Sequence, residues 1–254
     1  MEFRGLGFVP LFIAFWCTAW LVVSYTLTVI YGHAPLLMYI SETGNMYPEY
    51  ITFKIGFLGM SIGTLVLMLL LYKVILLHVE AYGARQPIIQ KILLALGITC
   101  CIGIAVMAVF KMEFYPMTHR VGSVISFTCG CIYNLWQAIL LYKVPGTRRA
   151  ICHIRMVSSA MAFIGIIVYN GCRVPVYTKL CTGECGMFIQ MICIIIEWLI
   201  LLLILIQVVT CFQPMQVSRC SPYYYLSYCN NIIITLYNAR IYYKDMCFFF
   251  STYH

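Results

Sequence analysis

The chain has 254 residues, of which 63% are hydrophobic and 9% are charged, and its formal net charge is +8. An ordinary soluble domain has about 25% charged residues. A soluble core of this length cannot bury so much apolar surface, so lipid must solvate part of it, and a soluble protein is excluded. The positive charge does not indicate nucleic-acid binding, because the basic residues lie mostly in short loops between apolar runs.

Six apolar runs predict an all-α, polytopic integral membrane protein, because each is long enough, or nearly so, to cross the bilayer as a helix. The expected spans are residues 8–30, 51–77, 92–110, 121–141, 154–171 and 187–210. The first run is too long for a signal-peptide core and lacks a clear cleavage site, so we interpret it as a retained anchor. The fifth run is the weakest, and it reaches a full span only if Arg155 snorkels to the interface.

The stretch from His119 to Arg155 sets the orientation. Its apolar run, residues 121–141, is followed by a short loop that is basic and holds no acidic residue. Such loops remain on the cytoplasmic side of a membrane. The N-terminus, the second and fourth loops and the tail together carry 11 of the 16 Lys and Arg residues. The sequence therefore predicts that both termini are cytoplasmic, with residues 1–210 forming the six-helix membrane domain.

The tail, residues 211–254, has a different character. It is rich in tyrosine and phenylalanine, is interrupted by asparagines, and has no apolar run long enough to span a membrane. We expect a cytoplasmic segment that is disordered or interfacial, and we expect a chain ending near Gln213 to fold as well as the full length.

Three glycines in the second span, Gly56, Gly59 and Gly63, lie on one face of the expected helix. Small residues at this spacing let two membrane helices approach closely. We therefore expect another helix to pack on this face.

Several short motifs carry a resemblance to a known family. They are Gly5-Leu6-Gly7-Phe8-Val9-Pro10; Tyr39-Ile40-Ser41-Glu42-Thr43-Gly44 with Pro48-Glu49; His119 with Gly122; Tyr142-Lys143; Cys152-His153-Ile154-Arg155-Met156; and Glu197-Trp198. Over about residues 3–210 the chain resembles the DNA-damage-regulated autophagy modulator family, with Glu42 where that family usually has aspartate.

The resemblance implies a six-span protein of lysosomes or related endomembranes that promotes autophagy and links it to apoptosis. The wider family also implies an alternative, because it includes plasma-membrane proteins tied to phosphoinositide metabolism and phospholipid asymmetry. The expected location is therefore the lysosome or another endomembrane, with the plasma membrane as the alternative. The expected partners are membrane lipids and other membrane or autophagy proteins, and not nucleic acid.

Glu197 is the sharpest chemical feature, because it lies near the middle of the sixth span. An ionised and unpaired carboxylate is costly there, so the side chain must face the bundle and be paired or protonated. Asn134 and Gln137, three residues apart on the fourth span, are its expected hydrogen-bond partners, since no Lys or Arg is expected at that depth. The group is then either structural or responsive to protons or lipid.

Asn134 and Gln137 have a second interpretation, which is that they line a translocation path. His119 begins the fourth span on the exoplasmic side. It is either a helix-end polar residue or, if that side is a lysosomal lumen, a group that titrates there. Glu42 and Glu49 fall in the first exoplasmic loop, where we expect a structural role or a role in recognition.

Cys172, Cys181 and Cys185 face the expected exoplasmic side, so two of the three are expected to form a disulfide. The remaining cysteines do not show a zinc-binding spacing, and no nucleotide loop or nucleophile motif is present. We therefore expect a protein that is not an enzyme, with no catalytic residues, no cofactor and no metal.

Overall fold

A computed structural model describes residues 7–81, 87–143, 147–177, 182–212 and 215. Within these residues the protein is all-helical, and six helices are long and apolar enough to cross a membrane. The helices are α1 (Phe8–Ile30), α2 (Glu49–Ala81), α3 (Pro87–Val109), α4 (Pro116–Tyr142), α5 (Arg149–Tyr177) and α6 (Gly183–Thr210), with a short 3₁₀ helix η1 (Ile40–Gly44) between α1 and α2. The predicted fold class is confirmed.

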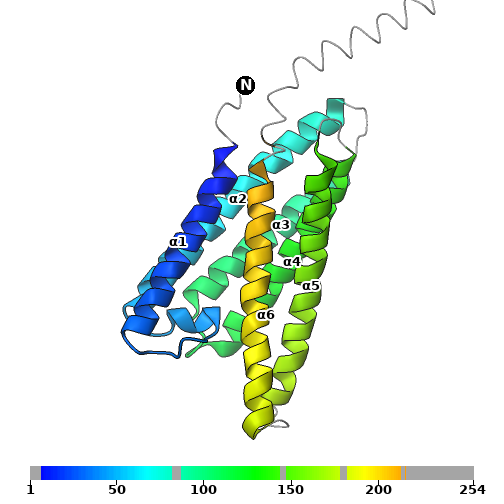
Figure 1. Cartoon of the computed structure of the whole chain (residues 1–254). Helices are drawn as coiled ribbons and strands as arrows, with labels where there is room; N and C mark the ends of the chain where they lie inside the picture. Colours follow the sequence, from blue (N-terminus) through cyan, green and yellow to red (C-terminus); the bar gives the residue numbers. More distant parts are fainter. Residues whose placement is uncertain (1–6, 82–86, 144–146, 178–181, 213–214, 216–254) are drawn as a thin grey trace, which may run out of the picture.

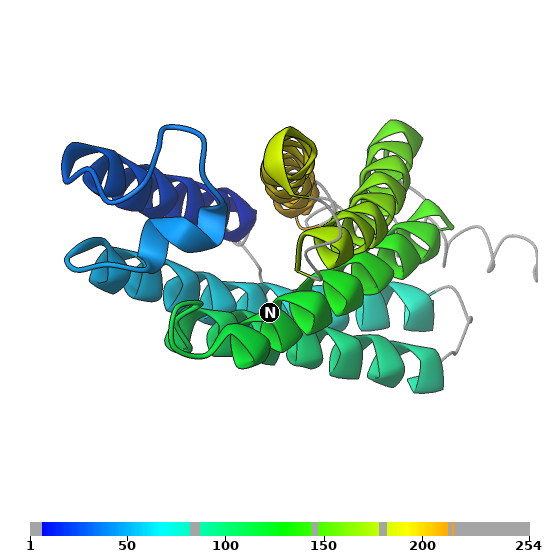
Figure 2. The same cartoon turned by 90° about the horizontal axis from the view of Figure 1, so that it is seen from below.

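The helices run up and down, and each packs against the next along the chain (Figure 1). α1 begins and α6 ends at the same end of the bundle, which we call the terminal end; η1 lies at the other, the loop end. Seen from the loop end, α6 lies between α1 and α5, and α2, α3 and α4 lie across from it (Figure 2). The cytoplasmic placement of the terminal end stays a prediction.

The helices α2 to α6 are longer than the expected spans. The largest difference is α5, which has 29 residues where the apolar run alone gave a marginal span. It is longer at both ends, because it begins at Arg149, with two turns before Met156, and ends at Tyr177. Those turns also carry Arg155, whose side chain is 0% exposed and does not snorkel, contrary to our expectation.

The glycine face of α2 is covered by α1, as predicted. A Cβ atom at Gly56 would lie 2.6 Å from Trp20, and one at Gly63 would lie 3.0 Å from Ile13. The Trp16 indole sits over Gly59 and donates from Nε1 to the Gly56 carbonyl oxygen at 3.2 Å. The glycines therefore bring the two helices close enough for ring-to-backbone contact.

The opposite pair of helices, α3 and α4, meets through its own glycines. Added Cβ atoms at Gly103 and Gly122 would fall 2.7 Å and 3.1 Å from backbone atoms of the facing helix. These contacts leave no room for a side chain, so the α3–α4 crossing depends on both residues.

The terminal end is closed by a buried apolar cluster that joins α1, α2 and the end of α6. It consists of Ile13, Leu67, Leu71, Val208, Cys211 and Met215. Met215, which is 2% exposed, thus belongs to the core. A chain ending near Gln213 would lack Met215 and so part of this cluster, which argues against the expectation that such a chain is as stable as the full length; that expectation stays untested, and residues 216–254 lie outside the described residues.

Candidate functional site: two polar clusters and the cavity between them

The first polar cluster lies at the loop end, where residues 38–44 enter the bundle. Met38, Tyr39 and Ile40 are 1%, 5% and 6% exposed. Glu197 of α6 accepts a hydrogen bond from the Ile40 backbone N–H at 3.2 Å, and Trp198 donates from Nε1 to the Met38 carbonyl oxygen at 3.0 Å. Irregular backbone at membrane depth needs such protein partners, because lipid offers none. Two consecutive residues of α6 therefore hold the loop.

This geometry corrects the expected partners of Glu197. Its carboxylate does not bond Asn134 or Gln137; it bonds the loop backbone instead. The sequence alone could not show this, because a backbone N–H carries no residue-specific signal. The motif that holds Tyr39 to Gly44 and the pair Glu197-Trp198, both noted for their resemblance to one family, are thus in direct contact.

Tyr39 is the aromatic centre of this cluster. The Arg173 guanidinium lies 4.5 Å from the centre of its ring, and the Tyr169 ring meets it edge-on at 6.4 Å. Burial raises the pKa of the Tyr39 hydroxyl well above its ordinary value. The stacked cation adds to the fixation of the loop.

Glu42 also acts within the loop. Its Oε2 accepts a hydrogen bond from the Tyr39 backbone N–H at 2.9 Å and caps the first turn of η1. Thr43, fully buried, donates to the Ile40 carbonyl oxygen at 2.7 Å. These contacts support the structural interpretation of Glu42.

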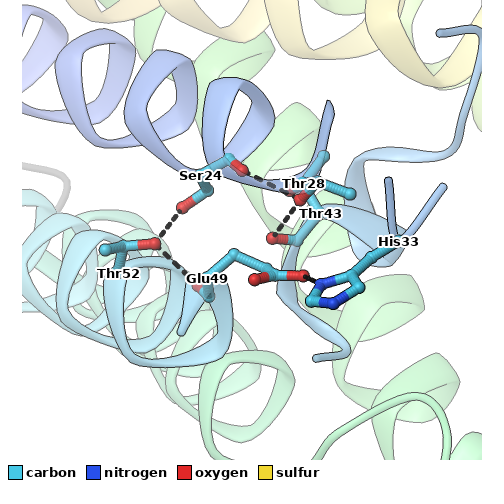
Figure 3. A network of polar contacts seen from close by, with 6 residues as sticks. All are labelled: Ser24, Thr28, His33, Thr43, Glu49 and Thr52. Atoms are coloured by element: carbon cyan, nitrogen blue, oxygen red, sulfur yellow. Dashed lines mark hydrogen bonds and ion pairs between the residues drawn. The ribbon is translucent and has the colours of Figure 1, made fainter. Parts of the chain in front are cut away.

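Glu49 is not a loop residue as expected, because it begins α2 and is 0% exposed. Its carboxylate pairs with Nδ1 of His33, whose side chain is 31% exposed (Figure 3). Thr52 donates to the Glu49 carbonyl oxygen at 2.7 Å and shares a hydrogen bond of 2.8 Å with Ser24 on α1. The network joins α1, the loop and α2 through polar groups alone.

His119 is buried, with 4% of its surface exposed, and its Nδ1 lies 2.8 Å from the Phe110 carbonyl oxygen. Phe110 follows the last residue of α3, so the histidine ties the α3–α4 connection together. His119 and Glu197 both line a cavity between α4, α5 and α6 that is partly open to the surroundings. The structure thus brings together two candidates that the sequence had not connected.

The second polar cluster lies toward the terminal end and is centred on Arg155. The buried guanidinium donates to Gln137 Oε1 at 2.6 Å, to Asn134 Oδ1 at 3.3 Å and to Cys211 Sγ at 3.0 Å. The side-chain Nε2 of Gln137 in turn donates to the Tyr133 hydroxyl at 2.7 Å. Asn134 and Gln137 therefore bond a cation of α5 and not the carboxylate of α6.

The sequence analysis missed Arg155, although a signal was present. Asn134 precedes the end of α4 by eight residues, and Arg155 follows the start of α5 by six. At 1.5 Å per residue both lie about 9–12 Å from the connection between the two helices, so Asn134 and Arg155 share one depth, and Gln137 lies one turn nearer the connection. The groups that accept from Arg155 in the described part of the chain include no carboxylate, and the guanidinium Nε has no partner there.

A central cavity extends between the two clusters. Its empty space is about 820 Å³, part of it open to the surroundings, and its walls come from η1, α2, α3, α4 and α6. The walls are mostly apolar, with Phe53, Phe57 and Met107 among them. Ser41 and Glu197 lie at the loop end of this cavity, and Asn134 and Gln207 lie toward the terminal end.

Of the three candidate disulfide cysteines, Cys172 carries a free thiol and packs against α6. Cys181 lies outside the described residues, so a pairing that includes it stays a prediction. Among the residues that the structure describes, no group of three or more His, Cys, Asp or Glu side chains could hold a metal ion.

Fold and site define a class of protein: a six-helix membrane bundle in which the loop between the first two helices enters the bundle and is held by the last helix. A family model described as Frag1/DRAM/Sfk1/Cwh43P N-terminal domain matches residues 5–215, and the chain belongs to this family.

Several curated proteins are similar to the chain. DNA damage-regulated autophagy modulator protein 1 of Mus musculus is 33% identical over 178 residues, which is 66% of this chain and 72% of that protein. The same-named protein of Xenopus laevis is 36% identical over 170 residues (65% and 70%). Modulator of macroautophagy TMEM150B of Xenopus tropicalis is 24% identical over 139 residues (53% and 58%). No solved structure matches the chain. The family and the printed names support an autophagy-related membrane protein.

Proposed function

We propose that the protein is a non-enzymatic regulator in lysosomal or other endomembranes that promotes autophagy and links it to apoptosis. The observation that carries the proposal is the similarity to proteins named as autophagy modulators, at 33–36% identity over about two thirds of the chain. Its partners are membrane lipids and other membrane or autophagy proteins, and not nucleic acid.

The structural support for a regulatory role is the contact between the loop and α6. Glu197 accepts from the Ile40 backbone N–H, and Trp198 donates to the Met38 carbonyl oxygen. The described part of the chain thus uses its buried polar residues to position elements. A regulator of this kind acts through the surface that the positioned loop presents.

The test is the location of a tagged full-length chain together with autophagic flux. Cells that lack the protein should show reduced flux, measured as the accumulation of a lipidated autophagosome marker with and without lysosomal inhibition. Wild-type protein should restore flux and co-localise with lysosomal markers. Unchanged flux after loss would contradict the regulatory role, and a purely plasma-membrane location would contradict the endomembrane assignment.

The alternative is lipid transport between leaflets or control of phospholipid asymmetry. The central cavity favours lipid transport in part, since the cavity reaches from Glu197 to Gln207. Its walls between these residues are mostly apolar, which suits a bound chain better than a moving head group. Purified protein in liposomes that scrambles a fluorescent phospholipid would establish transport, and an inactive protein under the same conditions would exclude it.

A further inference from the structure

The terminal end of the central cavity contains buried polar groups that have no partner within the described protein. Gln207 is 0% exposed, lines the cavity, and neither its amide nitrogen nor its amide oxygen forms a hydrogen bond. Thr64 of α2 lines the same cavity, is 7% exposed, and its hydroxyl is also unpaired. Buried polar groups are nearly always paired, so two unpaired groups that line one cavity indicate a missing partner.

The positive charge of the neighbouring Arg155 indicates what kind of group the missing partner is. Arg155 is a fully buried cation, and its bonded neighbours Asn134, Gln137 and Cys211 do not supply a carboxylate. A buried charge without a counter-ion is unfavourable. Asn134 connects the guanidinium to the cavity, because its Oδ1 accepts from Arg155 and the residue lines the wall. An anionic group near Gln207 would compensate this charge.

The apolar part of the cavity indicates the chemistry of the rest of the ligand. Its walls toward the loop end are apolar and include Phe53, Phe57 and Leu201. The Glu197 side chain lies at that far end and already accepts from the Ile40 backbone N–H, whereas the unpaired Gln207 amide lies at the other end, so a polar head group fits near Gln207. Because the cavity is only partly enclosed, a long chain can continue into the surrounding lipid.

We propose that the central cavity binds a long-chain fatty acid, with its carboxylate at Gln207 and Thr64 and its acyl chain along the apolar walls. The Gln207 amide and the Thr64 hydroxyl donate hydrogen bonds to the carboxylate, and Arg155 favours its charge through Asn134. The inference rests on the cavity and goes beyond the proposed role in autophagy, so either can fail without the other.

The experiment uses purified full-length protein in phosphatidylcholine nanodiscs and palmitic acid that carries a photoactivatable diazirine on its chain. Mass spectrometry of the cross-linked peptides should place the label on cavity walls such as Met68 or Cys100, and unlabelled palmitate should compete. The methyl ester of the probe should label more weakly, since it lacks the charge that Arg155 favours.

Gln207→Leu is the decisive variant. It is similar in size, and removing an orphan amide leaves no partner behind, so the variant should fold and melt no lower than wild type. Labelling should fall about tenfold, which is the loss of one to two hydrogen bonds. Gln90→Leu is the matched control: Gln90 is buried on α3, has an unpaired amide oxygen, and lines a different cavity. It should leave labelling unchanged.

Three results would overturn the proposal. Labelling of Gln207→Leu equal to wild type would remove the assigned head-group site. Equal labelling by the acid and its ester would exclude a carboxylate ligand. An unlabelled cavity, with the label confined to lipid-facing residues, would show that ordered water and not a fatty acid partners Gln207.

Discussion

Replacement of Glu197 by leucine should loosen the loop at residues 38–44 while leaving the helices in place. The Ile40 N–H, on a residue that is 6% exposed, would lose its acceptor at 3.2 Å. An unsatisfied buried donor costs about 1–3 kcal/mol. For a chain of this length that corresponds to a melting temperature lower by roughly 2–10 °C.

Two further variants separate the hydrogen bond from the charge. Glu197→Gln keeps an acceptor oxygen and should lose less than about 1 kcal/mol. Trp198→Phe removes the donor to the Met38 carbonyl oxygen, at 3.0 Å, and should cost about 1 kcal/mol. Because both residues hold one loop, the double variant should be less than additive.

The assay is thermal unfolding of the purified proteins in detergent, together with limited proteolysis of residues 32–48. Glu197→Leu should be cleaved there faster than wild type, and Glu197→Gln should resemble wild type. A leucine variant as stable and as protected as wild type would show that the Ile40 contact does not hold the loop. A glutamine variant as unstable as the leucine variant would show that charge, and not an acceptor, is required.

Three other predictions follow from the packing and the charge pattern. In the same melting assay, Gly103→Ala should destabilise the protein by about 1–3 kcal/mol, because its methyl group would lie 2.7 Å from backbone atoms of α4. Gly171→Ala is the control: an added Cβ there has nothing within 4 Å, so this variant should be neutral or stabilise the protein by up to about 1 kcal/mol. A chain that ends after Met215 should insert and melt like the full length, whereas one that ends at Gln213 should melt lower; equal melting would show that Met215 does not contribute to the core. Single cysteines in residues 147–152 should be inaccessible to an impermeant reagent applied from the exoplasmic side, and labelling there would reverse the orientation.

The sequence was sufficient for the features that depend on composition and periodicity. Apolar length predicted six helices, and the spacing of Gly56, Gly59 and Gly63 predicted a close helix contact, which α1 supplies. These signals are local, because they depend on a helix's own residues. The expectation that Glu197 faces the bundle also holds, since its carboxylate bonds the loop within it.

The hydrogen-bond partners of the buried polar residues could not be predicted from composition and periodicity. Glu197 was paired with Asn134 and Gln137 because side chains were the only partners that a sequence shows, whereas the actual partner is the Ile40 backbone, 157 residues away. Arg155 was placed at the interface because a long cation near a helix end usually snorkels. Glu49 was placed in a loop because the second apolar run begins only at Ile51, whereas the helix itself begins two residues earlier, directly after Pro48.

The contact between the loop and α6 also has a consequence for biosynthesis. The Ile40 N–H and the Met38 carbonyl oxygen are made early, but their partners Glu197 and Trp198 belong to the last span to leave the ribosome. Until then the loop backbone has no partner from α6, and one wall of the central cavity is missing. A nascent chain that stalls before α6 therefore exposes polar backbone at membrane depth, which makes completion of the final span the step at which quality control can distinguish finished from unfinished protein.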